Sequence, residues 1–198
     1  MKLVLASKNA HKLEELRDIL RRQGVDVVLE SEVGVDVDVE ETGTTFEENA
    51  RLKARAVMEA SGLPAVADDS GLCVDALNGA PGVYSARYGG EGLDDVGRYR
   101  LLLENMRGML DRRCKFVSCI CCCFPNGDMV EARGECQGTL AYAPKGADGF
   151  GYDPVFFVPA LKKTFAELAP AEKNAISHRG AALKEFNTKL ENYLNGLK

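Results

Sequence analysis

The feature that most constrains the fold is an amphipathic helix between residues 45 and 62. Thr45 followed by Glu48 forms a capping box, which is a common start of a helix, and Gly62 stands where helices commonly end. The apolar residues between these ends recur at the spacing of one helix face: Phe46, Ala50, Ala54 and Val57. The sequence therefore predicts a helix that packs one face against a core.

Lys53 lies on that same apolar face, because it follows Phe46 by two helical turns. Burying an ammonium group is costly unless an anion meets it. We therefore expect Lys53 to contact either a carboxylate or the phosphate of a ligand. The alternative is a side chain whose stem is buried and whose ammonium group reaches solvent.

Two pairs of acids flank the helix in the sequence. Glu40 and Glu41 precede it, and Asp68 and Asp69 follow residues 64–67, which are apolar enough for a short buried strand that ends before the acids. Ligands of α/β proteins collect beyond the carboxyl ends of strands, so we expect acids in this position to bind Mg²⁺. The alternative interpretation places all four acids in solvated loops.

Successive residues of an extended segment point to opposite sides, so only one acid of each pair can face such a site. Residues 35–41 alternate between apolar and acidic types, and this alternation places Glu41 on the apolar side and Glu40 on the acidic side. A bulge in the segment would reverse the assignment. The alternation therefore favours Glu41 as the inward residue, and it does not decide between Asp68 and Asp69.

The composition is typical of a globular protein. With 198 residues, of which 45% are hydrophobic and 28% charged, we expect residues 1–198 to form a single domain. The net charge of −5 argues against nucleic-acid binding. The apolar start breaks at Ser7, and no stretch approaches about 20 apolar residues. We therefore expect a cytoplasmic protein without a signal peptide or a membrane span.

Four of the seven cysteines lie between residues 119 and 123. Residues 113–124 have the pattern of a buried central strand, which a turn at 125–128 joins to a second strand at 129–139. Cysteine packs as a small hydrophobe, and the spacing lacks the two-residue gaps of zinc and iron–sulfur sites. We therefore expect free structural thiols.

Three further patterns predict regular structure. Residues 2–6 and 25–29 predict short strands, separated by a helix that ends at Gly24. Residues 93–109 predict a helix whose buried side includes Val96, Leu102, Leu103 and Met106. The last helix places Leu183, Phe186 and Leu190 on one face, which closes the core or a subunit contact.

The segment from Ser7 to Lys12 connects the first strand to the helix that follows it. Such a connection brings backbone N–H groups, the positive end of the helix dipole and a lysine together, which favours an anion. It lacks the glycines of a Walker A loop. The alternative is that Ser7 or Asn9 only caps the helix.

Residues 143–158 predict a glycine-rich segment that carries aromatic rings. Gly151 permits close approach of the backbone, Phe150 and Tyr152 offer faces on which a base can stack, and Asp153 adds a polar edge. The alternatives are core packing for Phe150 and a helix cap for Asp153.

Residues 172–179 bring three cationic or titratable side chains together near a helix start: Lys173, His178 and Arg179. Lysine and arginine suit the carbonyl acceptor at position 6 of a purine. Because a stacked ring accepts any base, these polar groups are the expected source of specificity. The alternative makes His178 the partner of a capping Asp153.

Six motifs, in a consistent order from Ser7 to Arg179, resemble those of the inosine/xanthosine triphosphate pyrophosphatase family. They are Ser7-x-Asn9-x-x-Lys12, E-E-T-G-x-T-F-x-E-N-A at 40–50, A-D-D-S-G-L at 67–72, G-A-P-G-V-Y-S-A-R-Y at 79–88, F-G-Y-D-P at 150–154 and S-H-R at 177–179. Their co-occurrence is far more specific than any one motif.

The resemblance implies an α/β fold with an elongated mixed central sheet flanked by helices, and two lobes around an active-site cleft. It implies Mg²⁺-dependent hydrolysis of ITP, dITP and XTP to the monophosphate and pyrophosphate, by a homodimer that cleanses the nucleotide pool.

The resemblance also implies roles for individual residues. Asp69 would be the general base and a metal-linked carboxylate, with Glu40 or Glu41 as the other metal ligand, and Lys12 and Lys53 would act on the triphosphate. The phosphate loop would comprise Ser7, Lys8, Asn9, Ala10, His11 and Lys12. The nucleoside site would comprise Ser70, Phe150, Gly151, Tyr152, Asp153, Lys173, His178 and Arg179. Lys8 departs from the small residue expected there, and His11 is a similar departure.

Two other functions are compatible with parts of this pattern. One is a pyrophosphatase for another modified or pyrimidine nucleotide. The motifs F-G-Y-D-P and S-H-R argue against this alternative. The other is a nucleotide-binding protein that does not hydrolyse its ligand. The retention of Lys12, Lys53 and the four acids argues against it, because a sensor needs neither a metal site nor a base.

Overall fold

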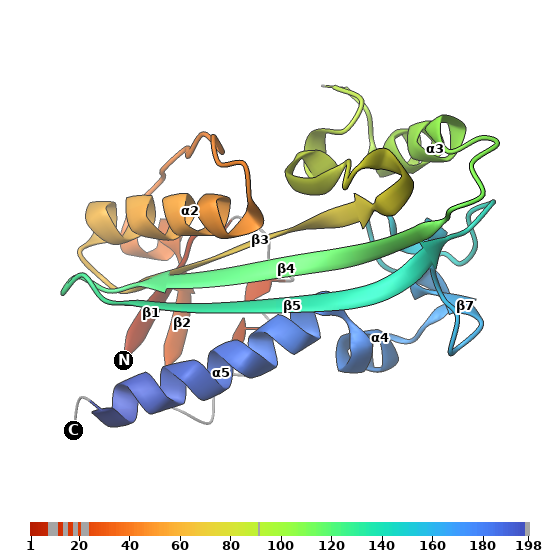
Figure 1. Cartoon of the computed structure of the whole chain (residues 1–198). Helices are drawn as coiled ribbons and strands as arrows, with labels where there is room; N and C mark the ends of the chain where they lie inside the picture. The colour runs from red at the N-terminus through yellow and green to blue at the C-terminus, as the bar shows by residue number, and fades with distance from the viewer. Residues whose placement is uncertain (8–11, 14–15, 18–19, 21–23, 91, 197–198) are drawn as a thin grey trace. The chain divides into compact units, whose positions relative to one another are not determined.

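The computed structural model describes residues 1–7, 12–13, 16–17, 20, 24–90 and 92–196. In this part of the chain seven strands form a mixed sheet in the order β2-β1-β3-β4-β5-β6-β7 (Figure 1). β1 pairs in parallel with β2 and β3, whereas β6 is antiparallel to β5 and β7. The strands are β1 (Lys2–Leu5), β2 (Asp26–Leu29), β3 (Ala65–Val74), β4 (Arg113–Cys123), β5 (Met129–Leu140), β6 (Phe156–Val158) and β7 (Lys163–Thr164).

The described α-helices are α2 (Phe46–Ser61), α3 (Asp95–Asn105), α4 (Pro170–Ile176) and α5 (His178–Gly196). Short 3-10 helices span Glu30–Val33, Asp75–Leu77, Gly82–Arg87, Asp153–Val155 and Phe165–Glu167. The predicted class, α/β with a mixed sheet, is confirmed. No described helix has both the length and the apolar character that a membrane crossing requires.

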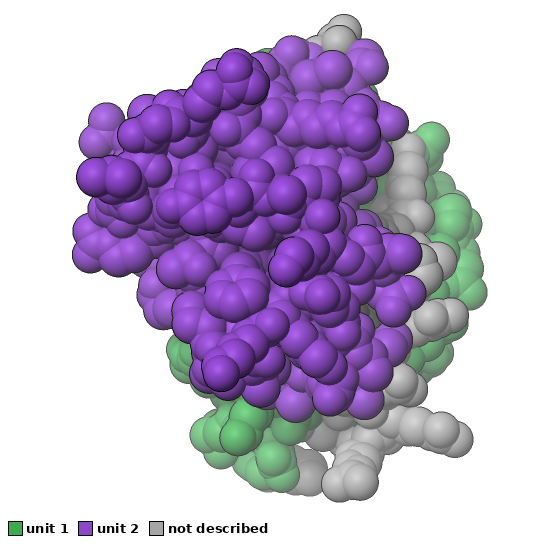
Figure 2. All heavy atoms as spheres, turned by 90° about the vertical axis from the view of Figure 1, so that its right-hand side faces the viewer, with its two compact units in different colours: residues 1–69, 118–134, 181–198 green, residues 70–117, 135–180 purple. Residues whose placement is uncertain are grey.

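The chain divides into two compact units, which Figure 2 colours separately. Unit 1 comprises residues 1–69, 118–134 and 181–198, and unit 2 comprises residues 70–117 and 135–180. The prediction that residues 1–198 form a single domain stays a prediction.

In unit 1 the central strand β4 presents alternate residues to two helices. Ile120 and Cys122 belong to the cluster that includes residues of α5, while Cys121 and Cys123 pack with Ala50 and Ala54 of α2. Figure 1 shows these two helices on opposite faces of the sheet. The predicted buried cysteine strand is confirmed, and all seven cysteines are free.

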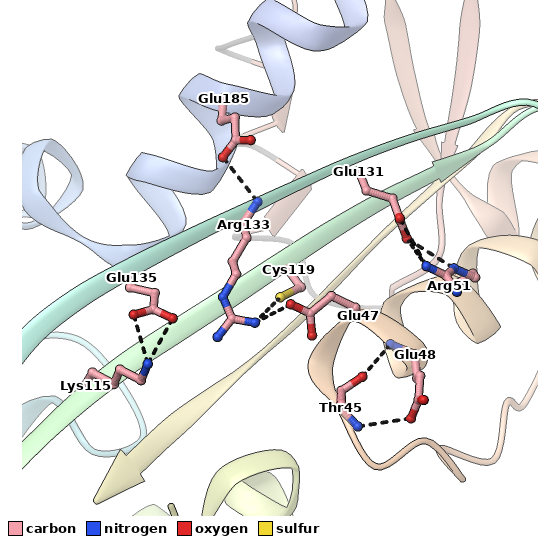
Figure 3. A network of polar contacts seen from close by, with 10 residues as sticks. All are labelled: Thr45, Glu47, Glu48, Arg51, Lys115, Cys119, Glu131, Arg133, Glu135 and Glu185. Carbon is pink, nitrogen blue, oxygen red and sulfur yellow. Dashed lines mark hydrogen bonds and ion pairs between the residues drawn. The ribbon is translucent and has the colours of Figure 1, made fainter. Parts of the chain in front are cut away.

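The predicted helix of residues 45–62 is present with both of its ends. The Thr45 hydroxyl accepts a hydrogen bond from the Glu48 N–H at 3.2 Å, and the Glu48 carboxylate accepts one from the Thr45 N–H at 3.2 Å (Figure 3). Gly62 adopts a left-handed φ of 68°, and its N–H bonds to the Met58 carbonyl. The capping box and the left-handed glycine therefore set the length of α2.

Ion pairs tie α2 to β5 inside unit 1. Arg51 of α2 donates two bonds to one carboxylate oxygen of Glu131, at 2.9 and 3.1 Å, and Arg133 pairs with Glu47 (Figure 3). These contacts add to the apolar packing of the helix, so α2 is held in register against the strand.

Two predictions for regular structure are corrected. Val96 was expected to be buried, but it is 37% exposed, because it lies in the first turn of α3 and the buried face is made by Tyr99, Leu102 and Met106. The strand expected at residues 64–67 is longer and runs over Ala65–Val74. The acids Asp68 and Asp69 therefore lie within β3, where the extended backbone continues, and not beyond its end.

Candidate active site

In unit 1, Lys53 of α2 lies between two carboxylates. Its ammonium group donates a hydrogen bond at 2.8 Å to Glu41 and another at 2.8 Å to Asp69. The side chains of Lys53 and Asp69 are only 17% and 10% exposed. The expectation that a carboxylate meets this lysine is confirmed, and the ammonium group does not simply extend into solvent.

The backbone carbonyl of Asp68 accepts from two lysines. Lys12 and Lys53 each reach this oxygen at 3.2 Å, and Lys12 also lies 3.5 Å from the Asp68 carboxylate. The pairing of β1 with β3 covers Ala65 and Val66, so Asp68 lies further along the strand. A carbonyl in such a position needs a donor, and the lysine ammonium groups supply it.

The sequence did not single out Asn49, which the structure places beside Asp69. Asn49 is fully buried, and its amide N–H₂ group donates to Asp69 at 3.5 Å while its carbonyl oxygen accepts from the Gly43 N–H at 2.8 Å. A Cβ atom on Gly43 would lie 2.6 Å from that oxygen, so the close approach requires glycine. The available signal was a polar residue one turn after Phe46 on the buried face of α2.

Burial has opposite effects on the pKa values of Asp69 and Lys53. For Asp69, burial raises the pKa above its ordinary value, the Lys53 ammonium opposes the rise, and the nearby Glu41 and Asp68 add to it. For Lys53, burial lowers the pKa, but Asp69 and Glu41 outweigh this effect, so the pKa is raised overall. Lys53 is therefore held as a cation, while Asp69 binds a proton more readily than an exposed aspartate does.

The structure distinguishes the two glutamates. Glu41 is half-buried and bonds to Lys53, whereas Glu40 is exposed. The described part of the chain contains no group of three or more His, Cys, Asp or Glu arranged to hold a metal. Two carboxylates on one cation nevertheless fit Mg²⁺, which is commonly bound by one or two carboxylates together with substrate phosphates. The donor set of Glu41 and Asp69 is thus compatible with that metal.

The predicted phosphate loop is described only at its ends. Lys8, Asn9, Ala10 and His11 lie outside the described residues. Ser7 is half-buried and lines a separate cavity of about 510 Å³ with residues that include Glu30, Gly34 and Val35. Lys12, the last residue of this loop, contacts Asp68 and so belongs to the cluster of Lys12, Glu41, Lys53, Asp68 and Asp69, called here the lysine–carboxylate cluster.

Unit 2 contains a cavity of about 160 Å³, and all eight residues predicted for the nucleoside site line it. Its lining comprises Ser70, Gly71, Ser85, Ala86, Asp95, Phe116, Phe150, Gly151, Tyr152, Asp153, Lys173, His178 and Arg179. The Phe150 side chain is 51% exposed, so simple core packing of this ring is wrong. The Lys173 ammonium lies 4.8 Å and the Arg179 guanidinium 5.6 Å from the centre of that ring.

A tight turn carries Phe150. One carboxylate oxygen of Asp153 accepts a bond from the Phe150 N–H at 2.9 Å and pairs with the Lys173 ammonium. Gly149 has a φ of 80°, and a Cβ atom there would lie 2.1 Å from the same oxygen. Asp153 therefore shapes the turn and fixes Lys173. Its interpretation as a helix cap is wrong, because the 3-10 helix that begins at Asp153 has Tyr152 as its N-cap and no side-chain cap bond.

His178 and Arg179 stand at the start of α5. The His178 ring stacks on Phe116 with centroids 4.6 Å apart, and Arg179 donates to the Ser70 hydroxyl at 3.3 Å. The Tyr152 hydroxyl donates to the Ser85 carbonyl at 2.8 Å, and burial raises the pKa of Tyr152. The polar groups of the cavity are thus oriented by contacts within unit 2.

Five residues of the cavity lining were not predicted as site residues: Gly71, Ser85, Ala86, Asp95 and Phe116. The Ser85 hydroxyl accepts from the Leu72 N–H at 2.9 Å and donates to the Gly82 carbonyl at 2.7 Å. Ser85 stands in the motif at 79–88, which was a usable signal. Asp95 and Phe116 lie in a helix and a strand, where no local pattern marked them.

The structure thus combines a mixed α/β fold with a cluster of lysines and carboxylates in unit 1 and an aromatic cavity in unit 2. Residues 3–189 match the model described as the Ham1 family, and the chain belongs to this family.

Named relatives are similar over nearly their whole length. A dITP/XTP pyrophosphatase of Haemophilus influenzae is 50% identical, over 96% of this chain and 98% of the relative. One from an Exiguobacterium species is 45% identical, over 99% of this chain and 100% of the relative. The solved structure of a HAM1 protein from Coxiella burnetii has a TM-score of 0.93 and 44% identity, covering 97% of this chain and 99% of that one.

Proposed function

We propose that this protein is a dITP/XTP pyrophosphatase, which also accepts ITP and releases pyrophosphate and the nucleoside monophosphate. The near full-length similarity to relatives that carry this name supports the activity. The structural observation that carries the hydrolytic part is the convergence of Glu41 and Asp69 on the ammonium group of Lys53.

Asp69 is the proposed general base. Its carboxylate accepts the proton of a water molecule that attacks the α-phosphorus. Lys53 and Lys12 counter the negative charge of the triphosphate. Asn49 holds the second carboxylate oxygen of Asp69, which fixes the orientation of the base.

Mg²⁺ is the proposed cofactor, with Glu41 and Asp69 as the residues that hold it. When bound, the metal neutralises phosphate oxygens and helps to orient the reacting phosphorus. Glu40 is exposed, so we assign it no ligand role. Ser7 and the loop of Lys8, Asn9, Ala10 and His11 are proposed to contact the phosphates, as the resemblance implies.

The cavity of unit 2 is proposed to take the base. Phe150 provides a half-exposed ring for stacking, and Lys173 and Arg179 provide donors for the oxygen at position 6. Adenine carries an amino group there, so it would leave these donors unpaired, which costs orders of magnitude in turnover.

The assembly and the location are further parts of the proposal. We propose a homodimer in the cytoplasm, as the resemblance implies, with no nucleic-acid or membrane partner. Light scattering of the purified protein at several concentrations measures the mass of the assembly, and a monomer at all of them contradicts the dimer.

The test is pyrophosphate release from dITP, XTP, ITP, ATP, GTP and a pyrimidine triphosphate, with Mg²⁺ or with EDTA. We expect metal-dependent turnover of the first three far above the others. In Asp69→Asn, turnover is expected to fall by about 10²-fold or more while dITP still binds. Preference for a pyrimidine, or binding without release, would contradict the proposed activity.

A further inference from the structure

The first residue of α3 contacts the turn that carries Phe150. One carboxylate oxygen of Asp95 accepts a hydrogen bond from the Gly151 N–H at 2.8 Å, and the other accepts one from the Arg98 guanidinium at 3.1 Å. All of these residues belong to unit 2, and Asp95 lines the cavity. The arginine therefore orients the carboxylate that holds the turn.

Two successive backbone amides of the turn are thereby held by carboxylates. Asp153, inside the turn, accepts from the Phe150 N–H, and Asp95, outside it, accepts from the Gly151 N–H. Asp153 is 3% exposed and pairs with Lys173, so the inner anchor is fixed in the core. Asp95 belongs to a different element and supplies a second anchor.

The two anchors determine where the Phe150 ring lies. The ring is 51% exposed and lies near the cations of Lys173 and Arg179. Core packing does little to fix the position of an exposed ring. The backbone on either side of the ring must therefore be held by hydrogen bonds. A ring that is ordered only on binding lowers the apparent affinity for the ligand, because the competent state is then only fractionally populated.

We propose that Asp95 is a positioning residue for recognition of the base, acting through the Gly151 amide to hold the Phe150 ring over the cavity. The inference rests on the proposed function, in which Phe150 stacks on the purine of the substrate. Asp95 is absent from the lysine–carboxylate cluster, so its effect falls on substrate binding and not on the chemical step.

The first test is Asp95→Ala, assayed by pyrophosphate release from dITP. We expect KM to rise by about tenfold, the scale for loss of a hydrogen bond to a charged group, with kcat within about twofold. Asp95→Asn keeps an oxygen that can accept from the Gly151 N–H, so its KM is expected to lie between those of wild type and Asp95→Ala.

The matched control is Glu104→Gln. Glu104 of α3 pairs with Arg107 at the same i,i+3 spacing as Asp95 and Arg98, but it lies outside the cavity lining. We expect wild-type KM and kcat for this variant. Melting temperatures of the three variants separate loss of folding from loss of positioning.

A wild-type KM in Asp95→Ala would overturn the inference. A fall in kcat together with a fall in the melting temperature would also overturn it. Calorimetric binding of dITP in EDTA adds a readout that is independent of hydrolysis, with an expected tenfold weaker Kd in Asp95→Ala. If wild type binds dITP but does not release pyrophosphate, the activity fails while the positioning role is still decided by this comparison.

Discussion

The ammonium group of Lys53 lies 2.8 Å from a carboxylate oxygen of Asp69, and the two residues come from a helix and a strand of unit 1. Both side chains are largely buried, so each depends on the other for its charge to be tolerated. The ion pair thus connects α2 to β3, and it is also part of the candidate active site.

Lys53→Met tests this dependence. The variant keeps the length of the side chain but leaves Asp69 and Glu41 without their shared cation, so the free energy of unfolding is expected to fall by about 3 kcal/mol. Mg²⁺ should raise the melting temperature more in the variant than in wild type, because the metal replaces the missing charge. Thermal unfolding with and without Mg²⁺ measures both effects.

Lys115→Met provides the control, because it breaks the more exposed pair with Glu135. Its cost is expected to stay below about 1 kcal/mol, without any change in the response to Mg²⁺. Equal Mg²⁺ shifts in Lys53→Met and wild type would contradict the prediction.

The two glutamates before α2 offer a matched pair of substitutions. Glu41→Gln removes a proposed metal ligand, so the Mg²⁺ concentration for half-maximal activity is expected to rise by about tenfold or more. Glu40→Gln changes an exposed side chain and is expected to leave this concentration unchanged. A larger effect at Glu40 than at Glu41 would reverse the assignment.

Asn49→Leu removes the amide that connects Gly43 with Asp69. The Gly43 N–H loses its acceptor inside unit 1, so we expect the free energy of unfolding to fall by about 2 kcal/mol. Turnover is also expected to fall, because Asp69 loses the contact at its second oxygen. Urea unfolding and steady-state kinetics measure the two losses, and unchanged turnover would restrict Asn49 to a structural role.

The buried thiols predict a loss of stability in alkaline solution. Burial raises the pKa of Cys114 to about 12 and that of Cys136 to about 11, from an ordinary value of 9.0. The folded state therefore keeps protons that the unfolded state releases, and the free energy of unfolding should decrease as the pH rises from about 9 through 11. Urea unfolding at a series of pH values measures this slope.

Cys136→Ala removes one of these groups, and it is expected to reduce the slope of stability against pH. Thiol titration of the folded protein checks the same argument, because the raised pKa values of Cys114 and Cys136 leave little reactive thiolate at pH 8. Rapid reaction of all seven thiols in the folded protein would show that burial does not protect them.

Local patterns were sufficient for some elements and not for others. Thr45, Glu48 and Gly62 predicted both ends of α2, because caps are decided by residues a few positions apart. The end of β3 was wrong, because a strand continues wherever a neighbouring strand pairs with it, whatever its own side chains are.

The candidate site shows the same division. The position of Lys53 on the apolar face predicted its carboxylate contacts, since burial of a charge demands a partner. Asn49 and Asp95 were missed because each contacts residues distant in the sequence: Asp69 in one case and Gly151 in the other. A single sequence without pairing information does not indicate such contacts.

The register between β1 and β3 has a consequence for how the gene can change. Val4 pairs with Ala65 and Leu5 with Val66, and the count of residues from this pairing to Asp69 decides which acid points toward α2. One codon inserted between Val66 and Asp68 would exchange the two acids, because neighbours in a strand face opposite sides. A codon inserted in the connection after Gly62 would leave the two acids in place. Neighbouring parts of the gene therefore differ in whether they tolerate an insertion.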